Sequence, residues 1–235
     1  FRKLIFLTAF VLLLGLAANT VATDYYVATD GDDDDNGSIS SPFATVQKGF
    51  DTIDPGDTLY LRGGTYYENV RIYHDRQGDE NNWFKVTSYP GEWAIIDAQH
   101  SQAYATIRYS DGGHDQCPQY WIFENFEVTG GGIDNDTSSG GGIRLDTATD
   151  LTFRYLYIHD NYGNHGGNNG GIVIPNDSGA AHGITIEWCH LKDNACTDAG
   201  NCANITLFGD YIEDPASVDI DTALRHNEIC YNLIE

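Results

Sequence analysis

The chain has 235 residues, of which 41% are hydrophobic, so its length and composition fit one packed domain or two small ones. It carries 35 Asp and Glu against 12 Lys and Arg, which gives a formal net charge of −23. Nucleic acids and anionic membranes bind through a basic footprint, so a surface this acidic excludes both as partners. The charge remains compatible with an acidic glycan partner, if divalent cations bridge the two, and with a neutral glycan partner. Alternatively, it serves only to keep the protein soluble.

The first residues have the pattern of a secretory signal peptide. Arg2 and Lys3 precede an apolar run over residues 4–16, which is too short to span a bilayer comfortably and is followed by small residues. We therefore expect residues 1–23 to be removed and the rest to be secreted without a membrane anchor; an uncleaved anchor is the alternative. Phe1 is not an initiator Met and the last residues fall in mid-pattern, so we expect a fragment, truncated at its C-terminus.

The mature chain opens with a strand, a loop and a short helix. The strand covers residues 25–28, and the acidic loop 30–36 that follows is either a calcium site or a solvated turn. Apolar spacing over residues 44–53 predicts the helix, and Pro42 lies near its start, where a missing N–H costs least. Glycine-bounded, strand-like segments come next.

Four later segments align with apolar residues in common columns. They are Ile122–Gly130, Phe153–Asn161, Ile186–Asn194 and Leu224–Asn232. One column contains Phe153, Ile186 and Leu224, and another contains Ile158, Leu191 and Ile229. A second short motif repeats before each of the last three segments. Its copies are GGIRL (residues 141–145), GGIVI (170–174) and ANITL (203–207). Such self-similarity indicates a solenoid, with Asn161, Asn194 and Asn232 as a ladder of side-chain amides; an irregular β-sandwich is the alternative.

The N-terminal segments also resemble a known family. PFATVQKGFDTIDPGDTLYLRGGTYYE (residues 42–68) and VTSYPGEWAIID (residues 86–97) resemble the cap and first coils of right-handed parallel β-helix proteins, notably the family nine pectate lyases. The resemblance implies an all-β, right-handed, single-stranded parallel β-helix with a short capping helix. We expect this domain over residues 24–235, with the cap at about 24–68 and incomplete coils at about 69–235. The resembled lyases use a lysine base and a calcium ion held by aspartates.

Charged residues of the aligned coils form candidate catalytic columns. The first column contains His159 and Lys192, and the second contains Asp160 and Asp193. The third contains Arg154, Glu187 and Arg225. β-Elimination of a uronate needs a base for the proton α to the carboxylate and a cation for the developing charge. We assign Lys192 as candidate base, Arg154 and Arg225 as candidate catalytic arginines, and Asp160 and Asp193 as candidate Ca²⁺ ligands. The coils have IHDN and LKDN where those lyases have an aspartate pair before glycine, so a solvated, salt-bridged edge is the alternative.

Other polar residues have weaker assignments. His159, Tyr162 and His165 are candidate substrate-binding residues, and Tyr155, Tyr157 and Trp188 either stack on sugar rings or fill the core. Hydrolysis of a glycosidic bond needs a pair of carboxylates, and it remains an alternative with Asp146, Asp150 and Asp160 as the candidates. Cys196 and Cys202 are the candidate disulfide among five cysteines, and the scattered histidines do not predict a transition-metal site.

Two functions remain in view. The first is a secreted, monomeric, calcium-dependent lyase that cleaves an acidic extracellular polysaccharide such as pectate. The second is a non-catalytic β-helix that binds glycan or presents its loops, because the same solenoid carries many functions. A groove in which a basic residue and carboxylates converge would favour the first.

Overall fold

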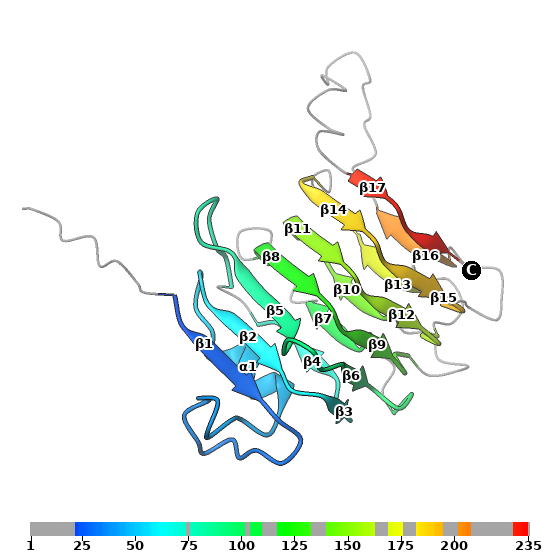
Figure 1. The fold of residues 1–235 in the computed structure, drawn as a ribbon. Coiled ribbons are helices and arrows are strands. Elements are labelled where there is room, and N and C mark those ends of the chain that lie inside the picture. The colour runs from blue at the N-terminus through cyan, green and yellow to red at the C-terminus, as the bar shows by residue number, and fades with distance from the viewer. Residues whose placement is uncertain are drawn as a thin grey trace, which may run out of the picture.

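The chain folds into a parallel β-solenoid. The computed structural model describes residues 22–73, 76–101, 104–109, 117–132, 140–162, 169–175, 182–194, 202–207 and 228–234. Each coil passes through three sheets in turn and returns to the first sheet one level further along the axis (Figure 1). Neighbouring strands pair in parallel throughout the sheets, which confirms the predicted parallel β-helix.

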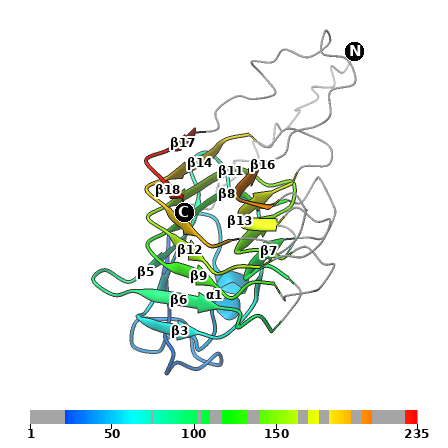
Figure 2. The ribbon, with the colours of Figure 1, turned by 90° about the vertical axis from the view of Figure 1, so that its right-hand side faces the viewer.

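The described residues place seven, six and five strands in the first, second and third sheets. The first sheet contains β1 (Asp24–Val27), β2 (Thr58–Leu61), β5 (Phe84–Ser88), β8 (Gln119–Glu124), β11 (Thr149–Arg154), β14 (Ile184–Glu187) and β17 (Glu228–Cys230). The second contains β3 (Gly64–Tyr66), β6 (Ala94–Asp97), β9 (Glu127–Thr129), β12 (Tyr157–His159), β15 (His190–Lys192) and β18 (Leu233–Ile234). The third contains β4 (Val70–Arg71), β7 (Ile107–Tyr109), β10 (Ile143–Leu145), β13 (Asn169–Ile174) and β16 (Cys202–Leu207). Figure 2 shows the second sheet rising from β3 to β18.

The predicted capping helix is α1 (Val46–Thr52), at the N-terminal end of the stack (Figure 1). Thr45 caps it, because the Thr45 hydroxyl accepts the backbone N–H of Lys48 at 3.1 Å. Phe50 of α1 is buried and stacks on Trp121, with ring centroids 5.5 Å apart. The helix therefore closes one end of the core. No helix of the described residues is long and apolar enough to cross a membrane.

The segment that follows the acidic loop 30–36 pairs with the outer edge of β1. The N–H of Tyr26 donates to the carbonyl of Gly37 at 2.8 Å, and Phe43 both donates to the carbonyl of Tyr26 and accepts from the N–H of Ala28. Within the loop, the Asp33 carboxylate accepts the hydroxyl of Thr45 at 2.8 Å. These contacts fix the loop against both the first strand and the start of α1.

The core is a stack of apolar side chains from successive coils. The ring centroids of Phe84 and Trp121 lie 4.4 Å apart, and those of Phe123 and Phe153 lie 5.3 Å apart. These four side chains are almost completely buried. Burial alternates along β11, as a strand with one face on the core requires. The pairing of Phe153 with Ile186 confirms two members of the first predicted column, and that of Ile158 with Leu191 confirms two members of the second.

Two of the aligned segments have a different register in the structure. Phe123, rather than Ile122, pairs with Phe153, which is a shift of one residue. Ile229 pairs with Ile186 and not in the column of Ile158 and Leu191, which is a shift of five residues. The error arises because several apolar residues in each segment fit an inward column equally well. Leu224 and Arg225 lie outside the described residues.

The asparagine ladder is confirmed for two of its three members. Asn161 Nδ2 donates to Asn194 Oδ1 at 2.8 Å, and both side chains are buried. Asn161 Oδ1 also accepts the N–H of Gly131 at 2.9 Å. The prediction is wrong for Asn232, which the register shift places at another corner, where its Oδ1 accepts the N–H of Cys189 at 2.8 Å.

Candidate functional site

The outer face of the second sheet brings together four of the predicted residues. β12 and β15 pair so that His159 lies opposite Lys192. The N–H of Asp160 donates to the carbonyl of Lys192 at 3.3 Å, which carries this register past the strand ends and places Asp160 and Asp193 in adjacent coils. Both aspartates have left-handed backbones, with φ of 48° and 50°. The predicted columns of base and carboxylate candidates therefore exist as neighbouring rows.

His159 lies between two carboxylates. Its Nε2 is 3.0 Å from Glu127 Oε1, and its Nδ1 is 2.7 Å from Asp160 Oδ2. The ring of Tyr157 stacks on His159 at 4.1 Å and on His190 at 4.7 Å. Each ring nitrogen of His159 therefore faces a carboxylate oxygen. These contacts hold the histidine in one orientation beside Lys192.

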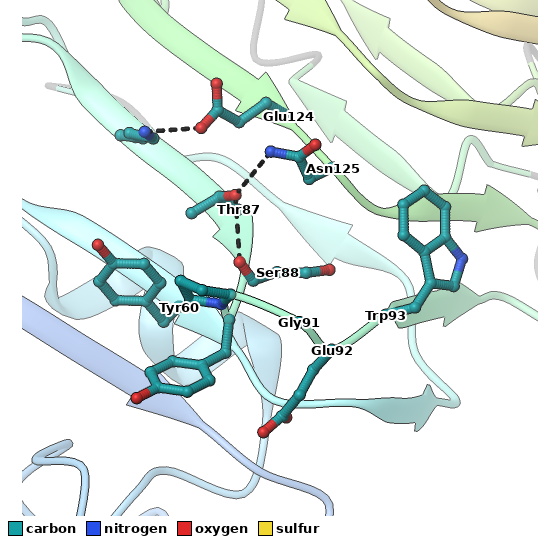
Figure 3. Close-up of a pocket in the computed structure, with 11 residues that line it drawn as sticks. Tyr60, Thr87, Ser88, Gly91, Glu92, Trp93, Glu124 and Asn125 are labelled. Atoms are coloured by element: carbon teal, nitrogen blue, oxygen red, sulfur yellow. Dashed lines mark hydrogen bonds and ion pairs between the residues drawn. The ribbon is translucent and has the colours of Figure 1, made fainter.

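A hollow of about 370 Å³ opens where the first sheet turns into the second. Its lining residues are Tyr60, Lys85, Thr87, Ser88, Tyr89, Pro90, Gly91, Glu92, Trp93, Glu124 and Asn125. In Figure 3 the rings of Tyr60 and Trp93 lie on opposite sides of the hollow, and Glu124 and Asn125 lie along a third edge. A hollow of this size, with rings and a few polar groups, suits a small-molecule or sugar site.

One carboxylate links the hollow to the row on the second sheet. The indole Nε1 of Trp93 donates to Glu127 Oε2 at 3.1 Å. The other oxygen of Glu127 is the one that contacts His159. The hollow and the residues around His159 and Lys192 are therefore parts of one continuous surface.

Two cations bracket a buried carboxylate at the edge of the hollow. Lys85 Nζ lies 2.6 Å from Glu124 Oε1 and Arg154 Nε lies 2.5 Å from Glu124 Oε2, while the Glu124 side chain is only 8% exposed. Burial raises the pKa of Glu124, but the hydrogen bonds from Lys85 and Arg154 outweigh burial and lower its pKa overall. The cluster carries one net positive charge in a strongly acidic protein. Lys85 and Glu124 of this cluster line the hollow, and Arg154 lies beside it.

The loop between β5 and β6 forms a braced wall of the hollow. The guanidinium carbon of Arg62 lies 4.9 Å from the ring centroid of Tyr89, and Arg62 pairs with Glu92 at 2.7 Å. Hydrogen bonds from Arg62 and from the backbone N–H of Gly63 lower the pKa of Glu92. The ring of Tyr89 therefore has a fixed position beside Tyr60.

Several sequence-predicted residues lie elsewhere. The ring of Tyr162 stacks on His100 at 4.4 Å, at the corner between the second and third sheets. Asp146 follows β10, Asp150 lies in β11 and Asp160 follows β12, so the three hydrolase candidates belong to different sheets. His165, Arg225 and the disulfide candidate Cys196 lie outside the described residues.

The described residues do not complete a calcium site. Among them, no group of three or more His, Cys, Asp or Glu side chains is placed to hold a metal ion. Ca²⁺ takes about six to eight oxygen ligands, whereas Asp160 and Asp193 supply two carboxylates. One of these, Asp160, already contacts His159.

Sequence reasoning does not single out four residues of this surface, namely Lys85, Trp93, Glu124 and Glu127. For the two glutamates a signal exists in IFENFEVTG, because alignment of Phe123 with Phe153 places both on outward positions. Trp93 and Lys85 have no repeat partner that would mark them, since they belong to the first coils and to a loop.

Comparison with known proteins identifies the family. A family model described as Pel9A-like, right handed beta helix region, matches residues 25–204. The chain belongs to this family. Membership in the Pel9A-like family agrees with the resemblance in the N-terminal segments and gives the predicted right-handed sense of the solenoid.

Relatives of this Pel9A-like chain include two pectate lyases. Pectate lyase PEL9 of Emericella nidulans is 34% identical over 118 residues, which are 47% of this chain and 29% of that protein. Pectate lyase L of Paenibacillus polymyxa is 32% identical over 133 residues, which are 53% of this chain and 27% of that protein. The chain therefore spans less than a third of the length of either relative.

A solved structure supports the fold alone. The native GH136 lacto-N-biosidase from Eubacterium ramulus superposes with a TM-score of 0.58 at 19% identity, over 88% of this chain and 40% of that chain. At this identity the similarity describes the shared architecture and says nothing about substrate.

Proposed function

We propose that the chain is part of a secreted polysaccharide lyase that cleaves an acidic glycan such as pectate by β-elimination. Membership in the Pel9A-like family and the two pectate lyase relatives support this reaction class. The single observation that favours catalysis over simple binding is the position of Lys192 opposite His159, on a surface continuous with the hollow.

In the proposed reaction Lys192 is the base. Its neutral amine takes the proton α to the uronate carboxylate, and the electron pair forms a carbon–carbon double bond as the bond from the β carbon to the glycosidic oxygen breaks. The leaving oxygen takes a proton from water, and the lysine later returns its proton to the solvent. His159 lies opposite Lys192 on the neighbouring strand. Glu127 and Asp160 hold His159 in place, so they act as positioning residues.

Cationic side chains are proposed to hold the substrate carboxylates. Lys85 lines the hollow and Arg154 lies beside it, both against Glu124, and each is a candidate to pair with a uronate carboxylate. Arg225 remains a candidate for the same role. His159 and Tyr162 remain candidates for sugar contacts, together with His165.

Calcium dependence is part of the proposal. Asp160 and Asp193 are the candidate ligands in the described residues, and the remaining oxygens would come from other residues, substrate carboxylates or water. A bound calcium ion would neutralise the substrate carboxylate and acidify the α proton.

We also propose that the protein acts as an extracellular monomer without a membrane anchor.

The test follows formation of the unsaturated uronate product by ultraviolet absorbance. The protein is mixed with polygalacturonate and a panel of other acidic glycans, first with calcium and then with chelator. We expect calcium-dependent product formation and a decrease in kcat of about 10²–10⁴-fold in Lys192→Ala. Lys48→Ala, on α1, is the matched control and should keep its activity.

A flat trace over the whole panel would refute the lyase proposal and favour the non-catalytic glycan-binding module. Full activity in Lys192→Ala would instead remove the assigned base. Activity that persists in chelator would remove calcium from the proposal. Circular dichroism of each variant is the control that tests whether the solenoid is intact.

A further inference from the structure

A row of aromatic side chains follows the corner at which the first sheet turns into the second. Tyr155, Trp188 and Tyr231 each come directly after a first-sheet strand in successive coils. The N–H of Tyr155 donates to the carbonyl of Glu187, and that of Trp188 to the carbonyl of Cys230, so the three residues occupy equivalent positions. The rings of Trp188 and Tyr231 stack at 4.5 Å with an interplanar angle of 10°.

The same row continues into the hollow. Asn125 occupies the equivalent position one coil earlier, because its N–H donates to the carbonyl of Arg154. Asn125 lines the hollow together with Ser88 and Trp93 (Figure 3). The aromatic row and the hollow therefore form one track along the axis of the solenoid, with a rise of about 4.8 Å per coil.

The backbone at this corner does not favour aromatic residues. The φ angles of Tyr155, Trp188 and Tyr231 are 54°, 55° and 55°. Asparagine adopts this left-handed conformation more readily than a bulky residue does, as Asn125 does at 59°. Backbone preference therefore does not explain why positions 155 and 188 are aromatic.

Core packing does not account for them either. Tyr155 is 48% exposed and Trp188 is 50% exposed, although each has a neighbouring coil on both sides. A large ring that strains its backbone and remains half in water gains little for the fold. The left-handed backbone recurs at other corners of the described coils, so the exposure of these large rings, together with their backbone, is what favours a binding role.

We propose that Tyr155, Trp188 and Tyr231 form a stacking platform for successive sugar rings of a polysaccharide chain that continues into the hollow. A pyranose has an apolar face for ring stacking and hydroxyl groups for the polar rim. Ser88 and Asn125 in the hollow, and Arg154 and Glu187 beside the rings, supply that rim. Covering the charged Arg154 and Glu187 with a wholly apolar partner would cost desolvation energy, so the surface fits a glycan better than an apolar protein segment.

This binding role does not depend on the proposed lyase chemistry, because it needs no base and no metal ion. It goes beyond the proposed function by giving the chain an extended contact surface outside the residues around Lys192. The platform predicts affinity for long chains in particular, since its rings lie on successive coils.

Affinity electrophoresis of the full-length protein in gels that contain polygalacturonate or neutral galactan tests the platform. Trp188→Ala and Trp188→Asn should each raise the Kd for the retarding polysaccharide about tenfold. Trp188→Asn also relieves the backbone, so it should fold at least as well as the wild type. Tyr67→Ala removes a 64% exposed ring after β3, at a different corner, and should not change the Kd.

The outcomes separate this proposal from the lyase proposal. Unchanged Kd values in both Trp188 variants, or no retardation of the wild type by either polysaccharide, would overturn the platform whatever the lyase assay gives. Lys192→Ala should lose product formation and keep its Kd, whereas Trp188→Asn should lose affinity while it remains folded. Equal loss of affinity in Tyr67→Ala would show that the effect is not specific to the row, and would also overturn the proposal.

Discussion

Trp93 and Glu127 are joined by a hydrogen bond of 3.1 Å from the indole Nε1 to Oε2, although one comes from a loop and the other from β9. Glu127 thereby has both oxygens occupied, one by the wall of the hollow and the other by His159. A change at this carboxylate affects both parts of the surface at once.

Glu127→Gln should lower kcat on the accepted polysaccharide about ten- to a hundredfold. The amide keeps one acceptor oxygen, so either Trp93 or His159 loses its partner, and a small displacement near the reacting atoms costs this much. Steady-state kinetics separate kcat from KM, and we expect the larger change in kcat. Glu80→Gln, at an exposed position, is the control. Wild-type kcat in Glu127→Gln would show that the carboxylate has no positioning role.

The Glu124 cluster should make stability depend on pH in the acidic range. The folded pKa of Glu124 lies below its ordinary value of 4.5, because the bonds to Lys85 and Arg154 outweigh burial. Its contribution is therefore present above pH 4.5 and is lost as the pH falls through the folded pKa. In urea titrations, Glu124→Gln should be less stable than the wild type by about 1.5–3 kcal/mol at neutral pH. The difference should shrink on acidification, and a constant difference would argue against the cluster as its source.

The asparagine ladder should contribute measurably to stability. Asn161→Ala leaves the buried N–H of Gly131 without its acceptor and Asn194 Oδ1 without the donor from Asn161, at a cost of about 1–3 kcal/mol in the free energy of unfolding. Asn81→Ala, at an exposed turn, should change stability by no more than about 0.5 kcal/mol. Equal denaturation midpoints for the two variants would contradict a structural role of the ladder.

The ring stack of the core should be the most sensitive to truncation. Phe153 is fully buried and its ring lies 5.3 Å from that of Phe123. Phe153→Ala removes the contacts and leaves a cavity, so we expect a loss of about 3–5 kcal/mol. Phe153→Leu keeps most of the volume and should recover much of this loss. Denaturant melts of the two variants, followed by circular dichroism, give the comparison.

Sequence alone predicts the architecture because the coils repeat. Pairings such as Phe153 with Ile186 and His159 with Lys192 follow from columns of like residues, and the capping helix follows from local apolar spacing. The family resemblance in the first coils adds the handedness, which a column alignment does not contain.

The remainder of the site depends on register. If Ile122 is placed opposite Phe153, Glu127 falls in the apolar column of Ile158, and its outward position is hidden. The structure pairs Phe123 with Phe153, and Glu127 then lies opposite Tyr157 on the outer face. Side chains alternate between the two faces of a strand, so a slip of one residue exchanges inside and outside.

The hollow has no sequence signature for a different reason. Its walls come from Tyr60 on one strand and from Trp93 on a later loop, and their meeting depends on how each coil bends at a corner. Composition and periodicity describe strands and their faces but not the shape of such bends.

The pairing of Gly37 and Phe43 with β1 has a consequence for the solution behaviour of the protein. A parallel solenoid with a bare first strand could recruit the last strand of another copy and grow into a fibre. Here Gly37 and Phe43 already occupy backbone groups on the outer edge of β1, and α1 covers the apolar end. The run of aspartates from Asp32 to Asp35 adds like-charge repulsion against a second acidic molecule. This end of the molecule is thus protected against head-to-tail polymerisation.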